Sequence, residues 1–413
     1  MRILSGTAAT ARVHKMAARG SQYAQVEPAV RRIIADVRKH GDRAIRKYAE
    51  RWDGLSQQEP LRVSEGKINA AWKSASPQLR NSLRVAAANI RRFCEWQKPA
   101  DWMRTRQGIS VGQIVRPLDS VGCYVPGGRY PLVSTLLMTV IPAQVAGVQN
   151  IRVASPQPRT EVLAAAGMLG VREVYRIGGA QAVAALAYGT QRVSRVDKIV
   201  GPGNVYVTAA KKLVSFDCAI DFLAGPTEVV IVSDKGNAEF IAGDLVAQAE
   251  HDTETFAAFI TTNEKLAQQV ARATEKLSAG NAVAKESLRR NGTILLSCSR
   301  CQSFEWANEL ASEHLTVDAG DVAFVRSAGS VFVGDYSPQA AGDYASGPNH
   351  VLPTGAAARF RGGLSVLDFL KVISVQRLSR PGLKSIAPVV ESLANAEGLR
   401  AHADSIRTRV AHA

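Results

Sequence analysis

The chain has 413 residues, of which 46% are hydrophobic and 21% charged, so its size and composition indicate a globular protein of two or more domains. The sequence contains no apolar run of about 18 residues, which excludes a membrane-spanning helix. Of the formal net charge of +15, most lies in residues 1–100, which carry 20 Lys or Arg against 8 Asp or Glu.

The first hundred residues are predicted to be helical. Apolar residues recur three and four apart over about 26–52 and again over about 76–96. Pro28 suits the first turn of one helix, and Ser76 followed by Pro77 suits the N-cap and first position of the other. The first 20 residues lack the apolar core of a secretory signal, so we expect a cytoplasmic protein.

The basic residues of this region lie between the apolar positions of the predicted helices. This pattern indicates a solvated helix face, and no nucleic-acid-binding motif accompanies it. We therefore expect neither a nucleic-acid nor a membrane partner. An RNA-binding scaffold is kept as the alternative from another functional class.

From about residue 117, short β-rich runs end in glycine turns and precede alanine-rich helical stretches. The clearest cases are SVGCYVPGG, VYRIGG before AQAVAALAYG, and KIVGPG before NVYVTAAKKLV, and EVVIVSD, AAFITT, TILLS and SVFVG add further strands. Such alternation predicts parallel sheets that bind ligands where strand ends meet helix N-termini. The predicted fold class is α/β, with two parallel-sheet, incompletely Rossmann-like lobes, N-terminal helices and a C-terminal helical arm.

Several polar groups are candidates for chemistry. Gln248 and His251 lie three apart in the helical DLVAQAEH, so both side chains can point toward one centre. Asp343 and His402 would join them only if the fold brings them there, and the set would then suit zinc or a similar divalent ion. The adjacent Glu313 and His314 could divide two proton transfers between them. Each pair taken alone is more often an ordinary polar pair.

The cysteines are too few and scattered for a disulfide framework, and we expect reduced thiols. Cys298 and Cys301 form a single C-x-x-C, which supplies only half of a structural zinc site. The sequence also lacks G-x-G-x-x-G after a strand, the P-loop motif, H-E-x-x-H and G-x-S-x-G. These absences weigh against P-loop hydrolysis, zincin proteolysis and α/β-hydrolase chemistry.

Taken together, the segments resemble the histidinol dehydrogenase family in order from about residue 23 to 408. The strings that carry the resemblance are GCYVPGG, GGAQAVAALAYGT, VDKIVGPGNVYVTAAK, AIDFLAGPTEVVIVSD, DLVAQAEH, SEHL, AGSVFVGDYSPQAAGDYASGPNHVLPT, GLSVLDFLK and AEGLRAH. Nine such strings in one order make the resemblance specific.

The resemblance implies roles for matching positions of this chain. One zinc ion per subunit would be held by Gln248, His251, Asp343 and His402. The catalytic pair would be Glu313 and His314. NAD would be contacted by Tyr124, Gln181 and Asn204. Substrate would be bound by the zinc ligands and His314 together with Thr227, His350 and Glu397.

The implied reaction is two successive hydride transfers to NAD that take L-histidinol through its aldehyde to L-histidine, the last step of histidine biosynthesis. His314 would be the base in both oxidations and Glu313 would activate water, whereas Cys123 would only pack. The family also implies an intertwined homodimer with shared active sites. The alternative within this chemistry is a zinc and NAD dehydrogenase of another small polyol, such as a sulfonated diol. The GGRYP stretch at 127–131 resembles the sequence of some of those dehydrogenases.

The resulting domain prediction has four parts. They are an N-terminal arm at 1–22, a first α/β lobe with the metal and catalytic residues at 23–123 and 228–362, a nucleotide-binding lobe at 124–227, and a C-terminal arm at 363–413 that completes the partner's site.

Overall fold

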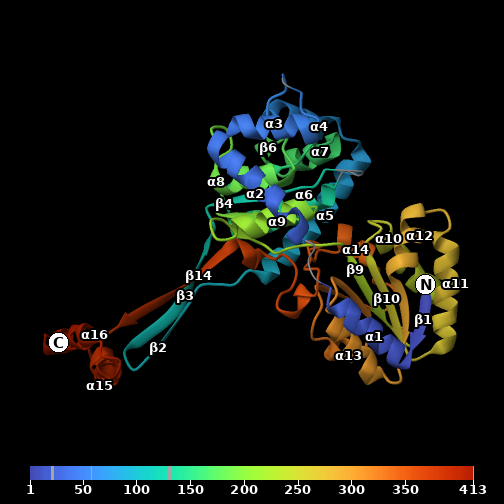
Figure 1. Cartoon of the computed structure of the whole chain (residues 1–413). Coiled ribbons are helices and arrows are strands. Elements are labelled where there is room, and N and C mark those ends of the chain that lie inside the picture. The colour runs from blue at the N-terminus through green and yellow to red at the C-terminus, as the bar shows by residue number, and fades with distance from the viewer. Residues whose placement is uncertain (20–22, 57, 128–131, 413) are drawn as a thin grey trace. The chain divides into compact units, whose positions relative to one another are not determined.

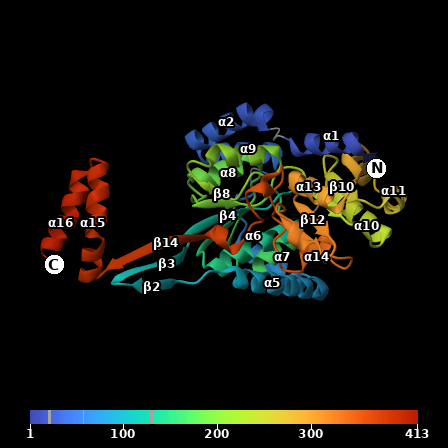
Figure 2. The ribbon, with the colours of Figure 1, turned by 90° about the horizontal axis from the view of Figure 1, so that it is seen from below.

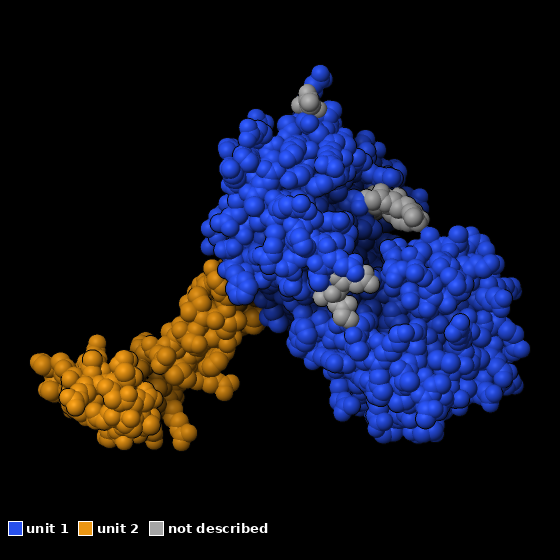
Figure 3. All heavy atoms as spheres, viewed as in Figure 1, with its two compact units in different colours: residues 1–97, 119–369 blue, residues 98–118, 370–413 orange. Residues whose placement is uncertain are grey.

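The computed structural model describes residues 1–19, 23–56, 58–127 and 132–412. These residues form two compact units (Figure 3). The larger unit, here called the body, comprises residues 1–97 and 119–369, and the smaller, here called the arm unit, comprises residues 98–118 and 370–413. Within the described ranges, no helix is both long and apolar enough to cross a membrane.

One lobe of the body is built on a six-stranded parallel sheet (Figure 1). In spatial order its strands are β1 (Arg2–Ser5), β11 (Gly292–Leu296), β10 (Phe256–Thr261), β9 (Glu228–Val232), β12 (His314–Val317) and β13 (Ser330–Val333). The central strands β9 and β10 are buried along their whole length, which explains why their sequences are apolar apart from Glu228 and Thr261 at the strand ends.

Helices cover both faces of this sheet. Side chains alternate along a strand, so Val229 and Ile231 of β9 pack on one side and Val230 and Val232 on the other. The first side is covered by α10 (Ala238–Ala249), α11 (Glu264–Ser278) and α12 (Ala282–Asn291). The second side is covered by α1 (Gly6–Ala17) and α13 (Arg300–Leu310), and the short α14 (Gln339–Tyr344) follows β13.

The other lobe has a five-stranded parallel sheet. In spatial order its strands are β6 (Glu173–Tyr175), β5 (Asn150–Ala154), β4 (Ser120–Tyr124), β7 (Lys198–Val200) and β8 (Ala219–Ile220). The chain proceeds from β4 outward through β5 and β6, then returns to the other side of β4 with β7. The gap between β4 and β7 is therefore a topological switch point, where open α/β sheets bind ligands.

Two layers of helices enclose the five-stranded sheet (Figure 2). One layer contains α2 (Tyr23–His40), α3 (Asp42–Trp52), α8 (Gly179–Tyr188) and α9 (Val205–Val214). The other contains α4 (Glu65–Ser74), α5 (Pro77–Gln97), α6 (Val133–Ala146) and α7 (Thr160–Met168). The two α/β lobes and the N-terminal helices thus confirm the predicted fold class.

The N-terminal helices differ in detail from the prediction. The pattern over 26–52 forms two helices, because Gly41 takes a φ of +52° between α2 and α3. Pro28 lies inside α2 as its sixth residue, not in the first turn. The prediction for α5 is confirmed: the helix begins at Pro77, and Ser76 Oγ accepts a hydrogen bond from the Leu79 N–H at 3.1 Å.

The structure divides the chain differently from the expected boundaries. Residues 2–5 form β1, which pairs with β11, and α1 packs on the same sheet, so the first 17 residues belong to the six-stranded lobe. The helices at 23–52 pack on the five-stranded sheet instead of on the lobe that begins at residue 228. Both segments are placed by distant apolar partners that local periodicity does not reveal.

The arm unit combines a sheet with a helix pair. Its antiparallel strands, in spatial order, are β14 (Leu370–Leu378), β3 (Ile109–Pro117) and β2 (Trp102–Arg106). The helices are α15 (Arg380–Ala396) and α16 (Arg400–Ala411), which pack on each other. The helical part was predicted from sequence, whereas the sheet was not.

Candidate active site

The predicted catalytic pair lies at the amino-terminal edge of the six-stranded sheet. His314 is the first residue of β12, Glu313 precedes it, and the neighbouring strand β9 begins at Glu228. All three residues are buried. We expected ligand sites at the carboxyl ends of strands. The predicted catalytic pair lies at the opposite edge. There the loop that enters β9 meets the segment after α14, and the Gly225 N–H donates to Thr354 Oγ1.

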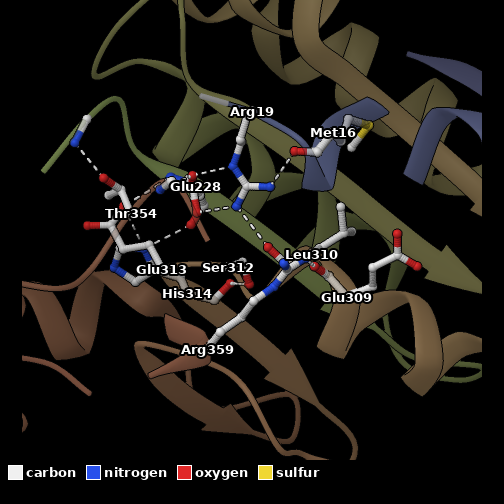
Figure 4. Close-up of polar contacts among 12 residues, drawn as sticks. Met16, Arg19, Glu228, Glu309, Leu310, Ser312, Glu313, His314, Thr354 and Arg359 are labelled. Atoms are coloured by element: carbon white, nitrogen blue, oxygen red, sulfur yellow. Dashed lines mark hydrogen bonds and ion pairs between the residues drawn. The ribbon is translucent and has the colours of Figure 1, made fainter. Parts of the chain in front are cut away.

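The main chain of Glu228 contacts both members of the pair (Figure 4). Its N–H donates to Glu313 Oε2 at 3.0 Å, and its carbonyl lies 3.2 Å from His314 Nδ1. A carbonyl can only accept, so Nδ1 carries a proton and Nε2 of neutral His314 is the free acceptor. Nε2 is buried without a hydrogen-bond partner among the described residues. In the neutral form of His314, Nε2 is therefore the nitrogen that can accept a proton, and it lies 3.4 Å from Asp343 Oδ1.

The pKa values of the pair are shifted by different causes. Burial raises the pKa of Glu313 to about 8, against the opposing effects of the His314 charge and the Glu228 N–H. Burial lowers the pKa of His314, but the carboxylates of Glu313 and Asp343 outweigh it and raise that pKa to about 9. The carboxylates beside His314 thus favour its protonated form, so the histidine must lose that proton before it can act as a base.

Asp343, in α14, brings several predicted residues together. One carboxylate oxygen, Oδ2, accepts from Gln248 Nε2 at 3.2 Å, and the other lies 3.4 Å from His314 Nε2. Its backbone carbonyl lies 2.6 Å from His350 Nδ1. His251 follows α10 and is exposed, with Nδ1 3.2 Å from the Gln248 carbonyl. The body thus places Gln248, His251, His314, Asp343 and His350 in one neighbourhood.

The donor set has the chemistry of a zinc site. Within the ranges described, no three His, Cys, Asp or Glu side chains are arranged to hold a metal ion. Two of the four predicted ligands explain this result, because Gln248 is an amide and His402 belongs to the arm unit. The body therefore contributes only His251 and Asp343 as imidazole and carboxylate ligands. Burial opposes ionisation of Asp343, but contact with His314 keeps the pKa of this carboxyl below its usual value. An anionic carboxylate, an imidazole and an amide oxygen fit zinc.

The two predicted site residues of the arm unit lie at its helix ends. Glu397 is the C-cap of α15, and His402 lies in the first turn of α16. Both side chains are exposed in the chain considered alone.

The predicted nucleotide-binding residues lie at the carboxyl edge of the five-stranded sheet. Tyr124 ends β4, Gln181 lies in the first turn of α8 after β6, and Asn204 caps α9 after β7. The Tyr124 hydroxyl accepts from the Gly179 N–H at 3.0 Å, and Asn204 Oδ1 accepts from two N–H groups of α9. Glycine turns at two neighbouring helix N-termini suit the pyrophosphate of a dinucleotide.

Gln181 and Tyr124 are both buried. Gln181 Nε2 donates to Asp53 Oδ2 at 3.1 Å, and Oε1 is buried without a partner among the described residues. Asp53 also accepts from the Gly178 N–H at 2.9 Å, and burial raises its pKa. Asp53 was not predicted from sequence, because it lies in a loop of the helical region far from the glycine turn that it holds.

The remaining substrate candidate, Thr227, is half-buried directly before β9, and its carbonyl accepts from the Phe256 N–H at 2.9 Å. Of the GGRYP stretch, residues 128–131 lie outside the described residues. Sequence reasoning also missed Glu228, whose position next to Thr227 in AGPTE was the one available signal.

The comparisons with known proteins agree over nearly the whole chain. The histidinol dehydrogenase family model matches residues 16–410. The histidinol dehydrogenase of Methanothermobacter thermautotrophicus is 46% identical over 393 residues, 92% of each chain. That of Haloarcula marismortui is 47% identical over 393 residues, again 92% of each chain.

Solved structures give the same result. The crystal structure of histidinol dehydrogenase from Elizabethkingia anophelis has a TM-score of 0.95 and 34% identity, covering 100% of this chain and 98% of that one. An acetylating aldehyde dehydrogenase from Geobacillus thermoglucosidasius, 12% identical with a TM-score of 0.51 over 86% of this chain and 98% of its own, shares the fold alone. The family model, the curated relatives and the matching structure together show that the chain belongs to the histidinol dehydrogenase family.

Proposed function

We propose that this protein oxidises L-histidinol through its aldehyde to L-histidine in a zinc-dependent, four-electron reaction linked to NAD. The observation that carries the proposal is the buried Glu313 and His314 pair beside Asp343 in a chain of this family. The reaction is the last step of histidine biosynthesis, and we place it in the cytoplasm, with no nucleic-acid or membrane partner.

We assign zinc to Gln248, His251, Asp343 and His402, and NAD to Tyr124, Gln181 and Asn204. When bound, zinc would hold and polarise the substrate and NAD would accept hydride, chemistry that side chains do not supply. Substrate would also contact Thr227, His350 and Glu397.

The residues of the chain itself move the protons. His314 Nε2 removes the alcohol proton in the first oxidation, because its Nδ1 is committed to the Glu228 carbonyl. In the second oxidation the same nitrogen takes the proton of the hydrated aldehyde. Glu313 assists the addition of water, because its carboxylate is held by the Glu228 N–H next to the histidine. Burial of the pair limits the access of bulk water.

We further propose a homodimer in which the arm unit of one chain supplies Glu397 and His402 to the site of the other. The arm unit is a compact unit of its own, and the other proposed ligands belong to the body. Its helix α15 exposes Val389 and Leu393, each at 60%. Apolar side chains exposed together on one helix are typical of a surface that another chain covers.

The test is NADH formation by the purified protein with histidinol, a sulfonated propanediol and simple diols. We expect two NADH per histidinol, loss of activity with a chelator, and recovery with zinc. Turnover of the sulfonated diol alone would assign the related polyol activity instead. The scaffold alternative would be favoured if the protein turned over no alcohol but bound RNA, with an affinity that falls steeply with salt and does not change when a chelator is added.

A further inference from the structure

Arg19 and Glu228 form a bidentate ion pair next to the predicted catalytic residues (Figure 4). Arg19 Nε and Nη2 donate to the two carboxylate oxygens of Glu228, each at 2.6 Å. Arg19 Nη1 also donates to the Met16 carbonyl at 2.7 Å, and Nη2 to the Leu310 carbonyl at 2.9 Å. The Glu228 side chain is 4% exposed and that of Arg19 is 20% exposed. Two parallel hydrogen bonds fix both the position and the plane of the carboxylate.

The same carboxylate is held from a second direction. Glu228 Oε1 also accepts from the Gly355 N–H at 2.8 Å, on the segment that follows Thr354. The side chain of Glu228 is therefore tied to the end of α1, to the end of α13 and to the loop after α14. Its peptide groups, one on each side of the Cα atom, are the groups that contact Glu313 and His314.

We propose that Arg19 is a positioning residue for the catalytic pair and acts through Glu228. The proposal rests on the roles given above to Glu313 and His314. With the carboxylate locked, the Glu228 N–H is aimed at Glu313 and its carbonyl at His314 Nδ1, which sets the tautomer of the base. Without Arg19, Glu228 becomes a buried carboxylate that has lost its cation, and it must turn toward solvent or take up a proton. We expect either change to turn the Glu228 peptide groups away from Glu313 and His314.

Arg19 could instead have a purely structural role and only hold the N-terminal segment against the sheet. A second arginine of the same segment, Arg12, serves as a control that distinguishes the two roles. Arg12, in α1, also contacts the sheet, where its Nε donates to Thr293 Oγ1 of β11 at 3.2 Å. Among the described residues, Arg12 makes no hydrogen bond or ion pair with Glu228, Glu313 or His314. Arg12→Ala is therefore expected to weaken docking of the same segment while leaving the catalytic pair in place.

The kinetic test compares Arg19→Ala, Arg19→Lys and Arg12→Ala in the full-length holoenzyme. For Arg19→Ala we expect kcat to fall about 10- to 100-fold, the usual cost of a misplaced catalytic group, with KM for histidinol and bound zinc within about twofold of wild type. Arg19→Lys keeps the charge but not the paired hydrogen bonds, so its kcat should be intermediate. Arg12→Ala should retain wild-type kcat even if its Tm falls. Unchanged kcat in Arg19→Ala, or equal losses in Arg12→Ala, would overturn the proposal.

A crystal structure of Arg19→Ala supplies a readout that does not depend on the substrate. We expect the Glu228 peptide groups to turn and the contacts to Glu313 Oε2 and His314 Nδ1 to lengthen. Unchanged contacts would overturn the positioning role whatever the kinetics. If the wild type does not oxidise histidinol but these contacts lengthen in the variant, the proposed function fails and the structural link from Arg19 to the pair stands.

Discussion

His314 is the residue whose loss should affect both oxidations. Its Nε2 is the one acceptor of the pair that is buried without a hydrogen-bond partner in the described chain. His314→Ala should slow oxidation of histidinol and of the aldehyde by about 10²- to 10⁴-fold, the usual contribution of a positioned base. The measurement is NADH formation with each compound supplied separately. A variant that loses the alcohol step but keeps the aldehyde step would require a second base.

Glu313 should matter chiefly for the second oxidation, because water is added only to the aldehyde. Glu313→Gln keeps the size of the side chain but removes the carboxylate that accepts from the Glu228 N–H. We expect slow conversion of the supplied aldehyde and a smaller loss in the alcohol step. Equal rates for wild type and variant with the aldehyde would remove Glu313 from the water-activating role.

Cys123 should be dispensable for catalysis. Its side chain is fully buried in β4, and burial raises the pKa of the thiol to about 12. A thiol is uncharged below its pKa, so Cys123 should remain unreactive toward iodoacetamide from pH 7 to pH 9, whereas the exposed Cys298 and Cys301 are labelled. Mass spectrometry of the labelled protein checks this. The Cys123→Ala variant should keep its dehydrogenase activity. A fall in kcat of more than about 100-fold would instead indicate that the Cys123 thiol forms a covalent intermediate.

At the scale of elements, the turn between β7 and α9 is held by a buried ion pair. Asp221 accepts from the Gly201 N–H at 2.7 Å, and Lys211 donates to the Gly201 carbonyl at 3.0 Å. Lys211 and Asp221 also pair with each other and are both buried. Gly201 has a φ of +111°, and an added Cβ would lie 2.2 Å from the Tyr124 carbonyl oxygen, so only glycine fits.

Lys211→Met should therefore loosen the turn and leave Asp221 as a buried carboxylate without its cation. We expect the free energy of unfolding to fall by about 3–5 kcal/mol. The KM for NAD should rise, because Asn204 follows this turn. Urea unfolding and NAD titration measure the two effects. The control is Lys212→Met, which removes an exposed lysine that pairs with Glu27; if it has the same effects, the buried pair is not their cause.

At the scale of the whole molecule, the shared site can be tested by complementation. His251→Ala and His402→Ala should each be inactive. In a mixed dimer with shared sites, one site carries both lesions and the other carries neither, so co-expression should restore up to half of the wild-type activity per mixed dimer. Mixed dimers that form but stay inactive would show that each site is built within one chain.

The sequence by itself determined the local features of this protein. Strand and helix alternation predicted two parallel α/β lobes, because side-chain periodicity reports which face of an element is buried. The spacing in DLVAQAEH predicted that Gln248 and His251 share a helix face. In the structure α10 ends at Ala249, and His251 lies beside Gln248 because its Nδ1 contacts the Gln248 carbonyl. Family-specific strings identified the histidinol dehydrogenase family, which the comparisons show.

Only the tertiary structure decided which distant segments meet. It paired β1 with β11, built a sheet in the arm unit from β2, β3 and β14, and put Glu313 and His314 at the amino-terminal edge of their sheet. It also joined Arg19 to Glu228, 209 residues away in sequence. The physical reason is that strands pair where whole faces of distant elements can be buried together, and buried charges pair where a distant element supplies the opposite charge. Neither condition can be read from a local sequence pattern.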